Sequence, residues 1–166
     1  MLLAQLSIEL DQLIARIEQM DAVMQRTAKE IEACQRLTSI PGIGPVTATA
    51  LVAAIGNGAG FRKGRDLAAW VGMVPREYST GGKQKLLGIS KRGNSYLRRL
   101  FVQGARSVLQ HRHNQPAALS SWLAQLLARS HQNVVIVALA NKLVRVAWAV
   151  LCKNEMYRIP VLATVP

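Results

Sequence analysis

Two adjacent hydroxyl side chains, Ser79 and Thr80, stand among glycine and basic residues near the middle of this chain. They belong to the segment 75–83 (PREYSTGGK), and a second basic segment follows at 89–99 (ISKRGNSYLRR). A hydroxyl attacks a phosphodiester only when the phosphate is held in line and its charge is offset. Arginine and lysine supply that offset, and glycine lets a polyanion approach the backbone. The pattern predicts a loop for phosphoryl chemistry, with a solvated basic turn as the alternative.

Positive charge is concentrated around this loop. The 166 residues carry 21 basic and 9 acidic side chains, a formal net charge of +12. Residues 1–36 hold six acids and four bases, a net of −2, whereas residues 37–166 hold 17 bases and three acids, a net of +14. Such a field is typical of nucleic-acid binding. An anionic membrane is the alternative partner, but we expect neither a signal peptide nor an apolar run of the roughly 20 residues that span a bilayer.

Apolar side chains recur every seven residues through the first 36 positions. One series is Leu3, Leu10, Ile17, Met24 and Ile31, and the other is Leu6, Leu13, Met20, Thr27 and Cys34. The spacing alternates between three and four without any Gly or Pro, which predicts a coiled-coil helix over 1–36. We expect a second subunit, or an antiparallel helix upstream of this chain, to cover this seam. The alternative is one long helix packed on its own domain.

The next segment, 37–56 (LTSIPGIGPVTATALVAAIG), has the pattern of a helix-hairpin-helix. Gly42 and Gly44 allow a tight turn, and the first turn of the second helix, which includes Thr47, would present free backbone amides and a positive dipole end. Such amides bind DNA phosphates without reading sequence. These three residues are therefore candidate DNA contacts, and a hairpin used only for packing is the alternative.

Further helices are expected over 65–72, 96–110, 116–130 and 133–153, the last one central because it is apolar almost all round. The segment 93–95 (GNS) is expected to offer a cap for the second of these, and Trp70 to lie in the core. Cys34 and Cys152 are predicted to be buried thiols without a metal or disulfide role. The predicted fold class is mostly α: a coiled-coil assembly helix over 1–36, a compact helical domain with the helix-hairpin-helix and serine loop over 37–155, and a tail over 156–166.

An ordered series of motifs resembles the C-terminal transposase domain of the IS110/IS1111 insertion-sequence transposases, the bridge-RNA-guided recombinases. The motifs are SIPGIGP at 39–45, FR at 61–62, AAWVG at 68–72, VPR at 74–76, STGGK at 79–83 and ISKRGN at 89–94. The resemblance covers about residues 1–155. The family pairs this domain with an RNase H-like, RuvC-type domain that carries four metal-binding acids. Three acids after residue 36 cannot make that set, so we expect the C-terminal portion of a longer enzyme, inactive alone.

The resemblance implies a serine nucleophile in the loop, which links covalently to DNA while the four-acid site of another subunit assists with Mg²⁺. Many members carry serine at the position of Thr80, but Ser79 is the stronger candidate here because a primary hydroxyl is less hindered than a β-branched one. Thr80 remains the alternative. No local general base is evident, because alternation is expected to turn Glu77 away and the loop contains no histidine. A base or metal supplied from elsewhere would fit this absence.

The leading hypothesis is therefore the catalytic half of a DNA transposase or recombinase. The alternative is a non-catalytic nucleic-acid-binding and dimerisation module. The expected partners are DNA, a guide (bridge) RNA and further copies of the chain through the heptad helix, with no cofactor bound by this chain itself. The resemblance implies a bacterial, cytoplasmic protein that associates with the nucleoid. The basic side chains expected to contact DNA are Arg76, Lys83, Lys85, Lys91, Arg92, Arg98 and Arg99.

Overall fold

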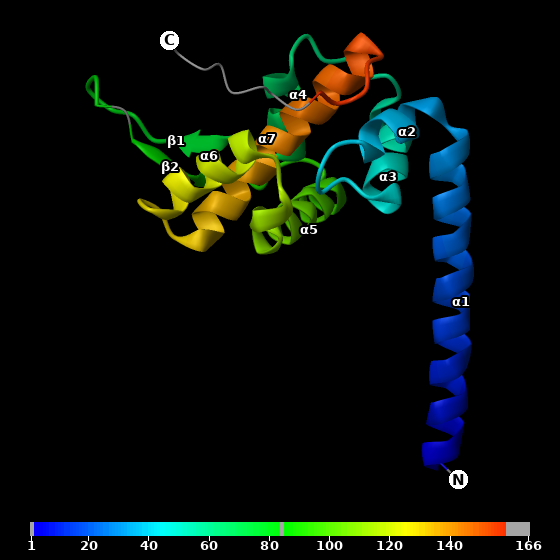
Figure 1. Cartoon of the computed structure of the whole chain (residues 1–166). Helices are drawn as coiled ribbons and strands as arrows, with labels where there is room; N and C mark the ends of the chain where they lie inside the picture. Colours follow the sequence, from blue (N-terminus) through cyan, green and yellow to red (C-terminus); the bar gives the residue numbers. More distant parts are fainter. Residues whose placement is uncertain (1, 84, 159–166) are drawn as a thin grey trace.

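The computed structural model of the chain describes residues 2–83 and 85–158 and is mostly helical, which confirms the predicted fold class (Figure 1). The helices are α1 (Leu2–Glu30), α2 (Glu32–Thr38), α3 (Pro45–Ile55), α4 (Gly64–Val71), α5 (Ser95–Gln110), the short 3-10 helix η1 (Arg112–Asn114), α6 (Ala117–Leu127) and α7 (Gln132–Lys153). The strands are β1 (Pro75–Glu77) and β2 (Leu86–Ile89), which pair antiparallel.

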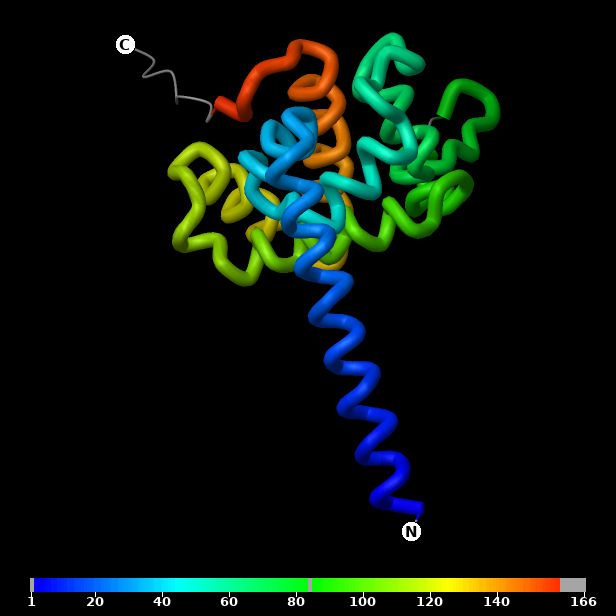
Figure 2. Tube along the Cα trace, turned by 90° about the vertical axis from the view of Figure 1, so that its right-hand side faces the viewer, coloured from blue at the N-terminus to red at the C-terminus, as the bar shows by residue number. Residues whose placement is uncertain are grey.

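Helix α1 projects away from the remainder of the chain, as Figures 1 and 2 both show. Its last turn packs through the buried Ala28, while the heptad side chains from Leu3 to Met24 are exposed. The predicted single helix over 1–36 is wrong at its end, because Ile31 is extended (φ −88°, ψ 113°) and separates α1 from α2. The Gln35 side chain bonds the carbonyl of Lys29 across this break, which replaces a helical hydrogen bond lost there.

Helix α7 lies at the centre of the domain, as its nearly continuous apolar sequence predicted. It packs against α2, α4, α5 and α6. The core side chains that it contributes are Val135, Ile136, Leu139, Ala140, Leu143, Val144, Ala147, Val150 and Leu151. By length and composition alone α7 also qualifies as a membrane-spanning candidate, contrary to our expectation, but half of the qualifying window is buried inside the protein. This burial is the mark of a core helix.

A tight turn joins α2 to α3 and rests on α5. Gly42 has a φ of +86°, and a Cβ atom there would lie 2.9 Å from the carbonyl oxygen of Gly104. A Cβ atom on Gly104 would lie only 1.9 Å from the carbonyl oxygen of Gly42. The two backbones therefore touch directly, and both positions require glycine for packing.

Two side chains depart from their predicted burial. Trp70 is 38% exposed and packs edge-on against Phe61 with ring centroids 5.8 Å apart, so it covers the core without entering it. Cys152 is exposed near the end of α7, whereas Cys34 is fully buried as expected. Desolvation raises the pKa of both thiols above the ordinary value, so neither is predisposed to act as a thiolate nucleophile.

Candidate active site and nucleic-acid interface

The predicted serine loop is the end of a β-hairpin. Beyond β1 and β2, Thr80 and Lys83 form an isolated bridge around Gly81 and Gly82. Both glycines have positive φ values, +58° and +79°, which is the backbone of a two-residue turn that continues the right-handed twist of the strands. Sequence reasoning missed the strands because they contain only three and four residues. The hairpin projects from the edge of the domain (Figure 1), and Ser79 is exposed on it.

Ser79 has a carboxylate partner at the end of β1, two residues before it. Its Oγ atom donates a hydrogen bond to Oε1 of Glu77 at 2.6 Å. The expectation that alternation would turn Glu77 away is wrong, because residues two apart in an extended strand project from the same side. Among the described residues, the Thr80 hydroxyl makes no comparable hydrogen bond. A carboxylate that accepts the hydroxyl proton is the arrangement that general-base activation requires.

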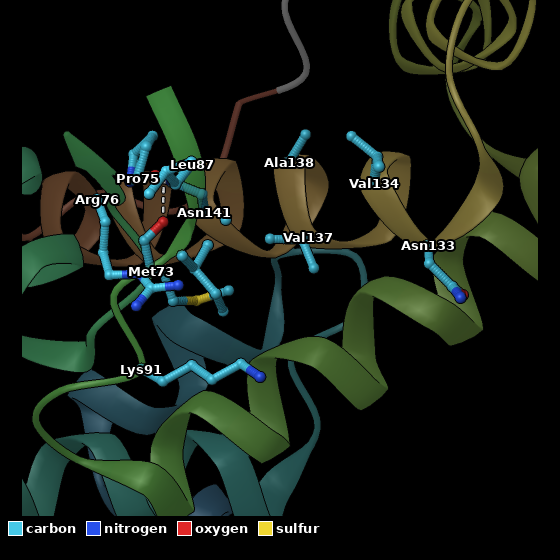
Figure 3. Close-up of a pocket in the computed structure, with 12 residues that line it drawn as sticks. Met73, Pro75, Arg76, Leu87, Lys91, Asn133, Val134, Val137, Ala138 and Asn141 are labelled. Atoms are coloured by element: carbon cyan, nitrogen blue, oxygen red, sulfur yellow. Dashed lines mark hydrogen bonds between the residues drawn. The ribbon is translucent and has the colours of Figure 1, made fainter. Parts of the chain in front are cut away.

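The base of the hairpin is fixed to α7. Asn141 donates a hydrogen bond to the Met73 carbonyl at 3.0 Å, which Figure 3 shows. A groove of about 570 Å³ lies between the hairpin and α7, and two of the predicted DNA contacts, Arg76 and Lys91, line it. Its walls are mainly apolar and include Val134 from the first turn of α7. The structure thus places one cation from each of the two basic segments at the same groove.

A second depression gathers three of the predicted cations. Lys91, Arg98 and Arg99 line a pocket of about 200 Å³ between the hairpin base and α5. Arg98 is half-buried, and its guanidinium donates to the Val71 carbonyl at 2.8 Å, so it also closes the C-terminal end of α4. Arg99 is exposed. Arg98 therefore has a structural partner already, which its sequence context did not reveal.

The remaining predicted cations lie on exposed backbone. Lys83 and Lys85 are at the hairpin end, close in sequence to Ser79, and Arg92 is in the segment that leads into α5. These three side chains are exposed and make no ion pair in the described part of the chain. They are available to a polyanion.

The segment from Lys91 to Asn94 folds onto the end of α4 through glycine. A Cβ on Gly93 would lie 1.9 Å from the Trp70 carbonyl oxygen, and one on Gly72 would lie 1.8 Å from the Arg92 carbonyl oxygen. Both glycines have positive φ, and so does Lys91 at +57°. The cap expected from residues 93–95 is provided by Asn94, whose side chain accepts from the Leu97 amide at 3.0 Å. This close contact fixes where the basic segment lies relative to the hairpin.

The helix-hairpin-helix candidates lie elsewhere along α5. Gly42 and Gly44 line a pocket of about 420 Å³ together with Gly104 and Ser107 of α5. Gly44 is exposed and precedes the first turn of α3, whereas Thr47 is only 7% exposed and its side chain lies in the core. Any phosphate contact at this turn would therefore use backbone amides and not the Thr47 hydroxyl.

Four cations outside these predictions meet in one pocket. Lys63 and Arg65 flank the start of α4, and Lys142 and Arg145 lie on α7. Their sequence signal is weak, because the two pairs are almost 80 residues apart and only the packing of α4 on α7 unites them. No group of three or more His, Cys, Asp or Glu side chains suited to hold a metal ion occurs within residues 2–83 and 85–158.

Comparison with known proteins decides the family. The model of the transposase IS116/IS110/IS902 family matches residues 34–121, more than half of the chain. The chain belongs to this transposase family. The matched range contains the α2–α3 turn, the serine hairpin and α5, so the features described above are those of a transposase-family domain. Helices α1 and α7 both lie entirely outside the matched range.

Relatives in three bacteria support the assignment. The chain is 47% identical over 157 residues to a probable family 20 transposase of Pseudomonas aeruginosa, covering 95% of this chain and 46% of the relative. It is 45% identical to the transposase for insertion sequence element IS1328 of Yersinia enterocolitica, covering 87% and 43%. It is 46% identical to the transposase for IS1111A of Coxiella burnetii, covering 81% and 37%. This transposase-family chain therefore spans less than half the length of these relatives.

Proposed function

We propose that this chain is the C-terminal catalytic half of a DNA transposase that breaks and rejoins DNA through Ser79. The observation that carries the proposal is the hydrogen bond from Ser79 to Glu77 on an exposed hairpin, with Arg76 and Lys91 lining the groove at the base of that hairpin. Family membership supports the reaction class. Ser79 is favoured over Thr80 because its hydroxyl is already directed at a proton acceptor.

In the cleavage step, the Ser79 Oγ atom attacks a backbone phosphorus atom of DNA. The Oγ–P bond forms, the bond from phosphorus to one sugar oxygen breaks, and the serine proton passes to the Glu77 carboxylate. The departing sugar oxygen takes up a proton. In the rejoining step, a sugar hydroxyl attacks the phosphoserine, and Ser79 leaves and regains a proton. One phosphodiester replaces another, so the exchange consumes no energy-rich cofactor.

The cations near the hairpin supply the positive charge that the Ser79 hydroxyl cannot provide. Arg76 and Lys91 face the groove at the hairpin base, and Lys83 and Lys85 lie at its end. In the proposal they hold the scissile phosphate or its neighbours and offset the charge that develops during attack. Arg98 serves mainly to hold the end of α4, with DNA contact as a secondary role, because its guanidinium already donates to Val71.

Metal and guide RNA belong to the longer protein in this proposal. The acids of the helical domain, Asp66, Glu77 and Glu155, are scattered, and the described residues offer no metal-holding group. They do not fit an Mg²⁺ site, so we assign Mg²⁺ to the RNase H-like domain that the family resemblance implies. The guide RNA is likewise proposed as a partner of the complete enzyme.

Self-association through α1 is the other part of the proposal. The heptad side chains from Leu3 to Met24 expose between 39 and 83% of their surface, although they form a continuous apolar stripe. An exposed stripe of this kind needs a partner helix in water. We propose that the α1 helix of a second copy covers it, which would bring two serine hairpins into one assembly.

The test uses the full-length enzyme with its guide RNA, Mg²⁺ and DNA target. Ser79→Ala is expected to abolish strand cleavage and the covalent protein–DNA adduct on a denaturing gel, while DNA binding stays nearly unchanged. Thr80→Val is the matched control and should still form the adduct. If Thr80→Val loses the adduct and Ser79→Ala keeps it, Thr80 is the nucleophile. If both variants cleave normally, the non-catalytic binding module is the better description.

A further inference from the structure

The pocket between α4 and α7 is strongly cationic and lies outside the serine hairpin. It has a volume of about 430 Å³, and four of its eight lining residues are basic: Lys63, Arg65, Lys142 and Arg145. No acidic side chain lines it. All four basic side chains are exposed, so they are accessible to a ligand from solution.

Backbone packing holds these cations together. A Cβ on Gly64 would lie 3.0 Å from the Arg145 carbonyl oxygen, so the start of α4 rests directly on the α7 backbone. Trp148 of α7 donates from its indole nitrogen to the Phe61 carbonyl at 3.2 Å, which ties the preceding loop to the same helix. Lys142 is held separately, with its ammonium 4.7 Å from the centre of the Trp122 ring. The cluster is thus built by rigid elements.

The four cations of this cluster have one acid close by in sequence, Asp66 in the first turn of α4. None of the four cations forms an ion pair within residues 2–83 and 85–158. Bringing like charges together raises the electrostatic energy of the folded state unless an anion offsets them. The free backbone amides at the start of α4 add to the positive potential. We infer that this pocket binds the phosphodiester backbone of a nucleic acid, at a site separate from the serine hairpin.

The position of the pocket suits a continuous nucleic-acid path. Asn141 in the groove and Arg145 in the pocket are four residues apart on α7, so they project from the same side. On α7, residues 133–141 contain those that line the groove, and residues 142–149 contain those that line the pocket. The midpoints of these two stretches are about eight residues apart. At 1.5 Å per residue this is about 12 Å along the helix, or roughly three to four base pairs at 3.4 Å each. This continuity of the path from the groove to the pocket rests on the proposed function.

The experiment compares two doubly substituted chains of equal net charge. Arg65→Gln with Arg145→Gln removes two pocket cations, and Arg16→Gln with Arg26→Gln removes two exposed cations of α1 as the matched control. Fluorescence anisotropy measures the affinity of each for a 20-base-pair duplex, as DNA and as RNA of the same sequence, over a series of salt concentrations. The slope of log affinity against log salt reports the phosphates contacted, at about −0.9 for each on B-DNA.

The pocket variant is expected to have a slope on duplex DNA that is shallower by up to about 1.8, for two phosphates lost, and the control variant a slope close to wild type. A change on RNA alone would assign the pocket to RNA. Lysine at both pocket positions should restore most of the slope, which separates lost charge from misfolding. Equal slopes for pocket and control variants on both duplexes would overturn the inference. The Ser79 adduct assay reports on the proposed function separately.

Discussion

Replacing two residues of the exposed α1 stripe by lysine tests whether a second copy covers it. Leu10 and Ile17 occupy equivalent heptad positions and are 57% and 60% exposed in the isolated chain. Lysine at both positions should leave the fold of each chain intact, because substitutions at exposed sites typically change stability by less than about 0.5 kcal/mol. The same change should strongly weaken any association that buries the stripe.

The size of that effect follows from the exposed surface. Full burial of a Leu or Ile side chain is worth about 1.5–3 kcal/mol, so a side chain that is six-tenths exposed has about 1–2 kcal/mol still to gain. A dimer contains four such side chains, and their loss removes about 4–7 kcal/mol of association free energy. Each 1.4 kcal/mol is a factor of ten, so the dissociation constant should rise by about 10³–10⁵. Any cost of desolvating the new ammonium groups adds to this.

Sedimentation equilibrium of the purified chain measures the effect directly. The wild type should sediment as a dimer or larger at micromolar concentration, and the variant as a monomer. Gln12→Lys with Gln19→Lys adds the same charge outside the stripe and should retain the wild-type mass. A variant mass equal to that of the wild type would refute the reasoning, and a monomeric wild type would show that another partner covers α1.

Three further substitutions test the hairpin and its supports. Glu77→Gln keeps a hydrogen-bond acceptor but removes the base, so single-turnover cleavage by the full-length enzyme should slow by about 10²–10⁴, with DNA affinity unchanged. Arg98→Gln should lower the free energy of unfolding in urea by about 1.5–3 kcal/mol. Arg99→Gln, at an exposed position, is the control and should have little effect. Equal effects of the two substitutions would contradict the role of Arg98 in closing the end of α4. Gly104→Ala should cost about 1–3 kcal/mol or more in thermal unfolding, because its Cβ would meet the Gly42 carbonyl oxygen. An unchanged melting temperature would contradict that close contact.

The helices were largely predictable from the sequence because their signals are long and local. The apolar run of α7 gave its bounds to within one residue, 133–153 expected and Gln132–Lys153 observed. The Asn94 cap was likewise recognisable from residue type and position. By contrast, the break at Ile31 carries no Gly or Pro. It arises from tertiary packing, because α2 must turn to bury Cys34 and Leu37 in the domain core.

The site was predictable in composition but not in geometry. The two basic segments and the hydroxyl pair were evident from residue types, yet Glu77 was misplaced because alternation was expected to turn its side chain away from the hydroxyls. In an extended strand, residues two apart share a side. The pocket cations Lys63 and Lys142 are far apart in sequence and become neighbours only through the packing of α4 on α7. No local sequence pattern predicts that these two side chains lie close together.

The attachment of the hairpin to α7 also bears on how this region can be cut for expression or for transfer into another enzyme. The range shared with the family model ends at residue 121 and already contains both basic segments and the hydroxyl pair. Yet Asn141, which holds the Met73 carbonyl, and the helix that fills the middle of the core both lie beyond it. A module trimmed to that range would contain all the sequence motifs of the family but would lack the α7 residue that anchors the serine hairpin. Useful boundaries must therefore include Lys153, far outside the part of the sequence by which the family is recognised.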